Sequence, residues 1–221
     1  MTDEQLAGTV DVMTSKHEHG PADIGRHPET AQEWDEKYSE ADRLWTTNVN
    51  PALVAEVGGL APGTALDIGS GEGADARWLT EKGWRVTAVD ISQVAVDRAR
   101  AADPDGTISW NRVDLTTESV PNTPFDLVSA FYFPIARVQE SLAEVLVGAV
   151  APGGRLLVVA HAAAGMAAHG FDASDYVFPS DIAEGLGDDW EVEVLQTRPR
   201  GVPAGNGAHI DDEVLRARRI R

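Results

Sequence analysis

ALDIGSGEGADARWLTEKGWRVTAVDIS, residues 65–92, is the stretch that decides the fold of this chain. Its apolar start predicts a short buried strand, which runs directly into a turn that contains Gly69, Gly71 and Gly73. Glycine has no Cβ, so the backbone can turn sharply there and come close to a ligand. Three glycines at the start of a helix are costly without such a use, which favours a binding role for the turn.

A helix and a second strand follow the turn. The helix is predicted to begin near Gly73 and to run to Lys82, where Gly83 is suited to end it. Its first backbone N–H groups point back at the turn, so they can receive a carboxylate or a phosphate. Residues 85–89 predict the second strand, and Asp90 stands at its carboxyl end, where an acid can accept both hydroxyls of a ribose. The unit therefore predicts a site for a nucleoside-containing cofactor.

The charges around the turn indicate which cofactor. The turn, Gly69 to Ala74, fits the dinucleotide fingerprint G-x-G-x-x-[GA], in which the start of the helix binds a pyrophosphate. Asp67 just before the turn and Glu72 inside it would oppose that charge. S-adenosylmethionine carries a sulfonium and an ammonium instead, and nearby acids stabilise both. The pattern favours S-adenosylmethionine, and an NAD(P)-dependent oxidoreductase is the alternative.

Three stretches carry a resemblance to a known family: DIGSGEGADARWLTEKGWRVTAVDIS at 67–92, WDEKYSEADRLWTTNVNPALVAEV at 34–57 and DDEVLRARRIR at 211–221. On these stretches the chain resembles the class I S-adenosylmethionine-dependent methyltransferases. It is most similar to the small bacterial enzymes related to the tellurite-resistance and thiopurine methyltransferases. The resemblance covers residues 34–221 and implies a methyltransferase (EC 2.1.1.-). These motifs are specific for the cofactor and are poor guides to the methyl acceptor.

Strands and helices alternate along residues 64–160, which is the pattern of a doubly wound α/β sheet. Ser92 is expected to cap a helix that runs to about Ala102. The further predictions are strands over 109–115, 125–133 and 155–160, a helix over 134–151, a long loop over 161–178, a short helix over 180–186 and a closing hairpin of 191–195 with 214–220. We therefore expect a mostly parallel, seven-stranded, Rossmann-like sheet of the class I methyltransferase type with a C-terminal antiparallel hairpin.

The composition indicates one globular domain. The chain has 221 residues, of which 43% are hydrophobic, and this is enough to build a sizeable core. We expect a single methyltransferase domain over residues 31–221, preceded by a mobile N-terminal segment over 1–30. That segment contains His17, His19 and His27, but its glycines and proline do not supply the fixed geometry of a metal site. No metal is expected.

The net charge of −18 argues against binding to nucleic acids or to anionic membranes. The chain contains no cysteine, which excludes disulfides and thiolate metal sites and fits a reducing compartment. The first 20 residues are polar and lack the apolar core of a signal peptide. These features predict a cytoplasmic protein, and a homodimer is left open.

The cofactor is expected outside the carboxyl ends of the strands, near the switch point of the sheet. Asp90 is expected to hold the ribose, Ile91 to lie against the adenine, and Asp67 to hold the methionine ammonium through water. By resemblance, Asp114 accepts the adenine amino group, with Leu115 beside it. The full set expected to contact the cofactor is Asp67, Gly69, Ser70, Gly71, Asp90, Ile91, Asp114, Leu115, Ala130 and Trp45.

Each of these assignments has a purely structural alternative. Asp90 could cap a surface helix, Ile91 could pack in the core, and Asp114 could be a solvated loop acid. Asp67 could pair with the helix dipole, and that role is compatible with binding an ammonium. Trp45 lies in the region that closes over the methionine end in related proteins, and its alternative is core packing of an N-terminal helix.

The methyl acceptor is the least determined part. The fourth strand ends Ala130-Phe131-Tyr132-Phe133-Pro134 and lacks the Asn/Asp-Pro-Pro-Tyr/Phe signature of enzymes that methylate bases or glutamine. Tyr132 could orient an acceptor and His161 could act as a general base; aromatic core packing and a structural histidine are their alternatives. Because neither is an unmistakable base, a soft or ionised acceptor is mildly favoured.

The expected function is methyl transfer from S-adenosylmethionine to a small molecule. Residues 1–50 and 161–180 are free to shape an acceptor pocket, and they contain aromatic and small residues rather than basic clusters. The alternative to an enzyme is a non-catalytic subunit that only binds S-adenosylmethionine. Such a subunit often loses a glycine of the turn or the ribose acid, whereas Gly71 and Asp90 are both present here.

Overall fold

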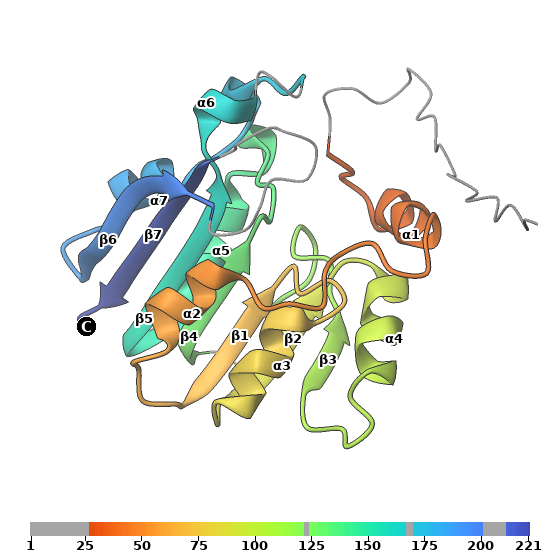
Figure 1. Ribbon diagram of the computed structural model, residues 1–221. Helices are drawn as coiled ribbons and strands as arrows, with labels where there is room; N and C mark the ends of the chain where they lie inside the picture. Colours follow the sequence, from red (N-terminus) through yellow and green to blue (C-terminus); the bar gives the residue numbers. More distant parts are fainter. Residues whose placement is uncertain (1–26, 122–123, 167–169, 201–210) are drawn as a thin grey trace, which may run out of the picture.

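A computed structural model describes residues 27–121, 124–166, 170–200 and 211–221. These residues form a seven-stranded sheet in the order β3-β2-β1-β4-β5-β7-β6. The strands are β1 (Thr64–Ile68), β2 (Arg85–Asp90), β3 (Ser109–Arg112), β4 (Phe125–Phe131), β5 (Val150–His161), β6 (Trp190–Pro199) and β7 (Asp211–Arg219). β1 to β5 pair in parallel, whereas β7 runs antiparallel to both β5 and β6 (Figure 1). The predicted fold class and the closing hairpin are confirmed.

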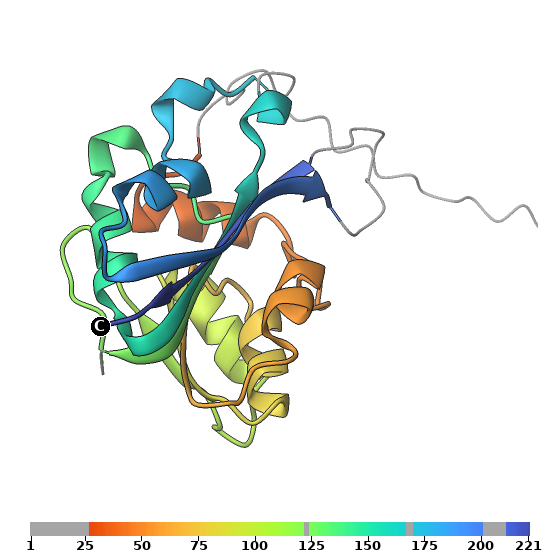
Figure 2. The same ribbon diagram turned by 90° about the vertical axis from the view of Figure 1, so that its left-hand side faces the viewer.

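Helices cover both faces of the sheet. The α-helices are α1 (Ala31–Ser39), α2 (Pro51–Val57), α3 (Ala74–Glu81), α4 (Gln93–Ala101), α5 (Ser141–Gly148), α6 (Ala163–Met166) and α7 (Pro179–Gly185), and two 3₁₀ turns are η1 (Arg137–Gln139) and η3 (Ala173–Asp175). In Figure 1, α2 and α3 lie in front of the sheet and α5 lies behind it, and Figure 2 shows the same layers edge-on, with the β6–β7 hairpin crossing the view. In the part of the chain that the structure describes, no helix is long and apolar enough to cross a bilayer.

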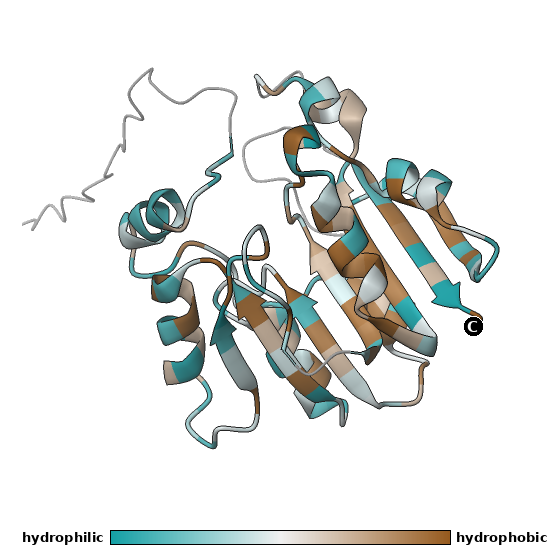
Figure 3. Ribbon diagram, turned by 180° about the vertical axis from the view of Figure 1, so that it is seen from behind, coloured by the Kyte–Doolittle hydropathy of each residue, from teal (hydrophilic) through white to brown (hydrophobic). Residues whose placement is uncertain are grey.

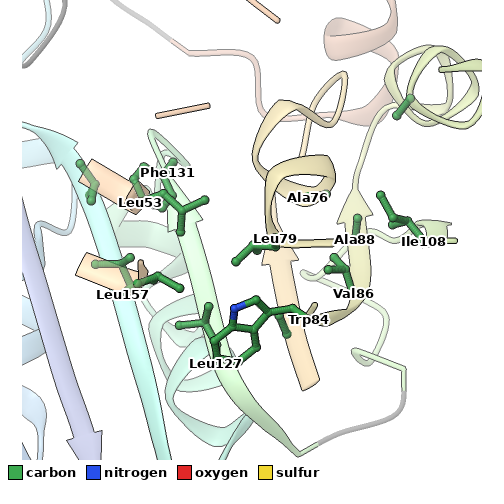
Figure 4. Packing of buried hydrophobic residues seen from close by; sticks show 14 of the residues in the cluster. Leu53, Ala76, Leu79, Trp84, Val86, Ala88, Ile108, Leu127, Phe131 and Leu157 are labelled. Atoms are coloured by element: carbon green, nitrogen blue, oxygen red, sulfur yellow. The ribbon is translucent and has the colours of Figure 1, made fainter. Parts of the chain in front are cut away.

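The sheet separates two hydrophobic cores. Strand side chains alternate between the faces, so Ala65 packs toward α2 and α3 whereas Leu66 and Ile68 pack toward α5. The first core contains Leu53 and Leu79 from these helices beside Trp84, which precedes β2, and the strand residues Leu127 and Leu157 (Figure 4). Both faces of the central strands are therefore buried, and these strands are the most apolar part of the molecule (Figure 3).

Some element boundaries differ from the predicted ones. The helix expected over 134–151 begins only at Ser141, because Ile135 and Ala136 pair with the segment 176–177: the Val177 N–H donates to the Ile135 carbonyl at 2.8 Å. The predicted loop 161–178 contains the short helices α6 and η3. The third strand ends at Arg112, so Asp114 lies in the following turn rather than on the strand.

The register of the sheet aligns the carboxyl ends of the central strands. Ile68 pairs with Val89 on one side and with Ala130 on the other, and Phe131 pairs with Val159. His161, at the end of β5, lies opposite Asp212 of β7. The glycine turn, the end of β2 and the ends of β4 and β5 thus lie along one edge of the sheet, at the top of Figure 1, and α1 lies above this edge.

Candidate functional site

The glycine turn connects β1 to α3 and needs glycine at three positions. Gly69, Gly71 and Gly73 have φ angles of 65°, 52° and 82°, a region that other residues rarely occupy. A Cβ would also meet a neighbour at each position: Phe133 at 2.9 Å from Gly69, the Tyr38 hydroxyl at 2.9 Å from Gly71, and the ring of Trp110 at Gly73. The turn is therefore both left-handed in conformation and tightly enclosed.

Asp90 braces this turn from the end of β2. The carboxylate is buried, and it accepts hydrogen bonds from the Gly71 N–H at 2.8 Å and from the Ser92 N–H at 2.9 Å. Burial raises the pKa of Asp90 to about 6, although these backbone N–H donors partly offset the effect. Asp90 thus joins the turn to the start of α4, and Ser92 caps that helix as predicted, by accepting from the Ala95 N–H.

Two further buried carboxylates lie beside the turn. Oδ1 of Asp67 accepts from the Ser129 hydroxyl at 3.1 Å, whereas its Oδ2 is buried without a partner among the described residues, as is Oγ of Ser70. Burial, and then the charge of Asp75, raise the pKa of Asp67 well above its usual range. Asp75, in the first turn of α3, accepts from the backbone and side-chain amides of Asn50, and burial also raises its pKa. Asn50 therefore binds Asp75 instead of capping α2.

Glu72 plays a different part from the one expected. Its Oε2 accepts from the N–H groups of Leu44 and Trp45, and its Oε1 pairs with Arg98 at 3.1 Å. Arg98 thus compensates part of the negative charge that the sequence had indicated for the turn. Its role is to hold the segment that carries Trp45 over the turn.

Trp45 and α1 cover the glycine turn. The Trp45 ring is 49% exposed, and its Nε1–H donates to the Tyr38 hydroxyl at 3.0 Å. A Cβ at Gly71 would lie between these two aromatic side chains. Asp35 fixes α1 to α4, because its Oδ1 accepts from Ser92 Oγ at 2.5 Å and from the Val94 N–H at 3.1 Å. Trp45 thus packs against the turn, and its contact with the cofactor stays a prediction.

Asp35 and Tyr38 were not predicted from the sequence, although the pattern that begins their helix can be recognised there. Thr30 and Glu33 form a capping box, in which the Glu33 N–H donates to Thr30 Oγ1 and the Thr30 N–H donates to Glu33 Oε2. A Thr-x-x-Glu pattern of this kind marks the start of a helix. The segment 31–39 is amphipathic enough to bury Tyr38 while exposing its other face.

Ile91, Asp114 and Leu115, which are predicted to contact the adenine, lie just after β2 and β3. Ile91 and Leu115 are both half-buried, and the Ile91 carbonyl accepts from Arg112 Nε at 3.2 Å. Asp114 is also half-buried, and its Oδ1 accepts from the N–H and the hydroxyl of Thr116. Ala130 is fully buried, and its side chain packs in the core on the α5 side, so only its backbone faces the edge.

A second cluster lies at the ends of β4 and β5. The Tyr132 hydroxyl donates to Asp212 Oδ2 at 2.9 Å, and the rings of Tyr132 and His161 are 4.7 Å apart. His161 Nδ1 faces Asp212 Oδ1 at 3.8 Å, and both of these buried atoms lack a partner among the described residues. The guanidinium of Arg200 lies over the Tyr132 ring at 4.4 Å. The structure thus brings the two predicted catalytic residues together around Asp212, which the sequence did not indicate.

His27 belongs to an aromatic group near this cluster. Its ring stacks on Phe171 at 4.6 Å and meets Tyr176 edge-on at 5.5 Å. Burial, then the charges of Lys37 and His161, lower the pKa of His27 to about 4, so the ring is neutral near pH 7. His27 was expected in a mobile segment, whereas His17, His19 and most of that segment lie outside the described residues, as does His169.

The central part of the chain is similar to known proteins. A family described as a methyltransferase domain matches residues 65–154, which include the glycine turn, Asp90, Asp114 and Tyr132. The matched segment is similar to this methyltransferase family over about two fifths of the chain. β7, the antiparallel strand inserted between β5 and β6, lies outside the matched residues.

A curated relative matches part of this chain. An uncharacterized methyltransferase of Mycobacterium tuberculosis is 35% identical over 121 residues, which cover 53% of this chain and 61% of the relative. The match therefore spans about three fifths of the length of that curated relative.

Two solved structures share the fold. The N-methyltransferase NodS from Bradyrhizobium japonicum, in complex with S-adenosyl-L-homocysteine, is 22% identical, with a TM-score of 0.68 over 88% of this chain and all of that one. A structure described under the conversion of a disulfide bond into a thioacetal group during echinomycin biosynthesis is 20% identical, with a TM-score of 0.69 over 86% of this chain and 91% of that one.

Proposed function

We propose that this chain is an S-adenosylmethionine-dependent methyltransferase that acts on a small-molecule acceptor. The observation that carries the proposal is the set of three buried carboxylates around the glycine turn, Asp67, Asp75 and Asp90, each with a raised pKa. Buried carboxylates favour a cationic ligand, because a nearby positive charge stabilises their ionised forms. A pyrophosphate would be repelled by the same groups, which argues against an NAD(P)-dependent oxidoreductase.

The residues at the turn fit S-adenosylmethionine. The buried Asp67 Oδ2 and Ser70 Oγ still need partners, and the methionine ammonium can supply one directly or through water. Asp90 would accept the ribose hydroxyls, Ile91 and Leu115 would contact the adenine, and Asp114 would accept its amino group. The bound cofactor supplies a methyl group that is activated by its sulfonium. The complex of NodS with S-adenosyl-L-homocysteine supports this choice, because NodS shares the fold.

The acceptor side supports a small molecule. Beside the ends of β4 and β5 lie the rings of His27, Tyr132, His161, Phe171 and Tyr176, and aromatic side chains of this kind favour a compact, partly apolar ligand. The net charge of −18 opposes the approach of nucleic acid. The protein then has only to place the acceptor atom in line with the methyl group and to exclude water.

The cofactor is tested by calorimetry with S-adenosylhomocysteine and with NADH. We expect binding of S-adenosylhomocysteine and no response to NADH. Gly71→Ala should weaken the binding at least about tenfold, because alanine is strained at a φ of 52° and its Cβ meets the Tyr38 hydroxyl. Gly106→Ala is the matched control: its φ is 62° and nothing lies within 4 Å of the added Cβ, so it should bind as the wild type does.

Three results would contradict the proposal. Tight binding of NADH without a response to S-adenosylhomocysteine would indicate an oxidoreductase. Incubation with methyl-labelled cofactor and a panel of small thiols, phenols, amines, cell extract and purified RNA tests the acceptor. Labelled RNA alone would exclude a small-molecule acceptor, and tight cofactor binding without any transfer would indicate a non-catalytic subunit.

A further inference from the structure

We propose that Asp212 is a positioning residue that holds the His161 ring with its Nδ1–H toward the carboxylate, which leaves Nε2 to take a proton from the methyl acceptor. The inference rests on the proposed function and narrows the acceptor to molecules that carry an O–H or N–H proton. It departs from the sequence-based preference for a soft acceptor, because Asp212 supplies what a general base requires and could not be recognised from local sequence.

The position of Asp212 is the first argument. It lies opposite His161 in the antiparallel pairing of β5 with β7, so the backbone register fixes the two residues side by side. Asp212 is only 4% exposed, and a carboxylate buried to this degree needs hydrogen-bond donors. Tyr132 supplies one donor, to Oδ2. The other oxygen faces His161 Nδ1 at 3.8 Å, which is too long for a hydrogen bond, and both atoms are buried without another partner among the described residues, so the proposed bond requires the two side chains to move closer.

The conformation of Tyr132 is the second argument. Within the described ranges it is the one non-glycine residue with a positive φ, 51°, a conformation that costs energy and persists only where the surroundings enforce it. Here the Tyr132 N–H donates to the Val159 carbonyl at 2.7 Å and its hydroxyl donates to Asp212. The strained backbone therefore holds the Tyr132 ring against His161 and keeps the Tyr132 hydroxyl in position to donate its proton to Asp212.

The same hydrogen bond assigns the roles of the two predicted catalytic residues. Burial and the charge of Asp212 raise the pKa of the Tyr132 hydroxyl, so this group keeps its proton and cannot act as a base. His161 is the remaining group. Its side chain is 32% exposed, which allows one nitrogen to reach an acceptor while the other lies against Asp212. The Ser-His-Asp triads place an aspartate behind a histidine for the same purpose.

The charges around His161 come from four segments. Asp212 of β7 carries the negative charge that faces His161, and Arg200, which follows β6, carries the positive charge that lies over the Tyr132 ring. Tyr132 is neutral, and His27 is also neutral near pH 7. In the reaction, the acceptor atom forms a bond to the methyl carbon with its lone pair, and the carbon–sulfur bond breaks with its electron pair left on sulfur. The proton of the acceptor atom moves to His161 Nε2 and then to solvent.

The tautomer of His161 tests this inference without an acceptor. In ¹⁵N-histidine-labelled protein, two-bond ¹H–¹⁵N spectra above pH 7.5 distinguish a ring protonated on Nδ1 from one protonated on Nε2, and His161→Gln identifies the signals. We expect Nδ1–H to dominate in the wild type. Asp212→Asn should reduce this fraction, because an amide can present its NH₂ group to the ring. Asp211→Asn is the matched control, one residue away and exposed, and should leave the spectrum unchanged.

The tautomer fractions either support or overturn the positioning role of Asp212. Equal tautomer fractions in the wild type and in Asp212→Asn, or a wild-type ring protonated on Nε2, would overturn the positioning role. The wild-type spectrum answers the question even if Asp212→Asn does not fold. Binding of S-adenosylhomocysteine, measured separately, keeps the two proposals apart: its absence counts against the proposed function, whereas a changed tautomer with intact cofactor binding supports the role of Asp212.

Discussion

Single carboxylates set the chemistry of the cofactor side. Asp90 accepts two backbone N–H groups and is still buried enough for its pKa to reach about 6, compared with its usual 3.8. Between these two pH values the folded protein binds a proton at Asp90 that the unfolded chain releases. The contribution of Asp90 to the free energy of unfolding therefore falls as the pH rises through this window, by about 3 kcal/mol as an order of magnitude.

The titration of Asp90 should make the affinity for the cofactor depend on pH. Only the ionised form can accept both ribose hydroxyls, so the affinity for S-adenosylhomocysteine should fall below pH 6, approaching about tenfold per pH unit for each proton taken up. Calorimetry between pH 5 and 7.5 measures this slope. Asp90→Asn should bind more weakly and should lose the share of the slope that comes from one proton. An unchanged slope in this variant would assign the titration to another group.

At the scale of elements, α1 is the part whose attachment depends on few contacts. Its buried residue is Tyr38, and Asp35 joins it to the start of α4 through Ser92 and Val94. Helix caps of this kind contribute about 1 kcal/mol. A helix that is held so weakly can open and close, and it covers the turn expected to bind the cofactor.

Asp35→Ala should loosen α1 without unfolding the domain. Loss of about 1 kcal/mol predicts roughly fivefold faster amide exchange over residues 31–39 and faster release of S-adenosylhomocysteine. Hydrogen exchange and stopped-flow release measure the two effects. Glu36→Ala removes the neighbouring exposed carboxylate, which accepts from the Gln32 side chain, and should leave both rates unchanged. Equal effects of the two substitutions would mean that the cap does not hold α1.

Elements that depend on local signals could be predicted from the sequence. The glycine turn, the helix after it and the strand that ends at Asp90 were predicted to within about two residues, because apolar patterning and turn residues act over short distances. The helix over 134–151 was predicted to start too early. Its apolar spacing extends to Ile135, but Ile135 pairs with Val177, and no local pattern indicates a partner so distant in the chain.

The whole molecule is held together across long distances by an ion network. Glu56 of α2 pairs with Arg198 at 2.8 Å and with Arg216 at 2.9 Å, and Arg216 also pairs with Glu193, which binds Arg155. Figure 2 shows the β6–β7 hairpin that this network ties to the rest of the sheet. Glu56 is 7% exposed, and its loss removes the carboxylate that Arg198 binds while leaving Arg216 with Glu193.

Glu56→Gln should therefore destabilise the whole domain, by about 2–4 kcal/mol in chemical denaturation. Asp189→Asn breaks the exposed pair with Arg221 and should cost less than about 0.5 kcal/mol. The comparison requires identical denaturant conditions, because salt screens the exposed pair more strongly. Similar losses in both variants would mean that the network contributes no more than a surface ion pair.

The candidate acceptor site also depends on distances that the sequence does not reveal. Asp90 could be predicted because a fixed local unit places it, whereas Asp212 meets Tyr132 only through the pairing of β5 with β7. The charge of Glu72 was misjudged for the same reason, since its partner Arg98 comes from another helix. The positions of side chains within the local strand–turn–helix–strand segment could be predicted from the sequence. The contacts of side chains whose partners come from distant strands or helices could not.

The place of β7 in the sheet has a consequence for how the protein is made. β7 follows β6 in the chain but lies between β5 and β6. On the ribosome, β6 therefore emerges before the strand that joins it to the sheet, and it waits as an unpaired segment with exposed Val192 and Leu195. Asp212 arrives with the same late strand. The nascent chain can assemble β1 to β5 during translation, whereas the cluster of Tyr132 and His161 is completed only when β7 inserts.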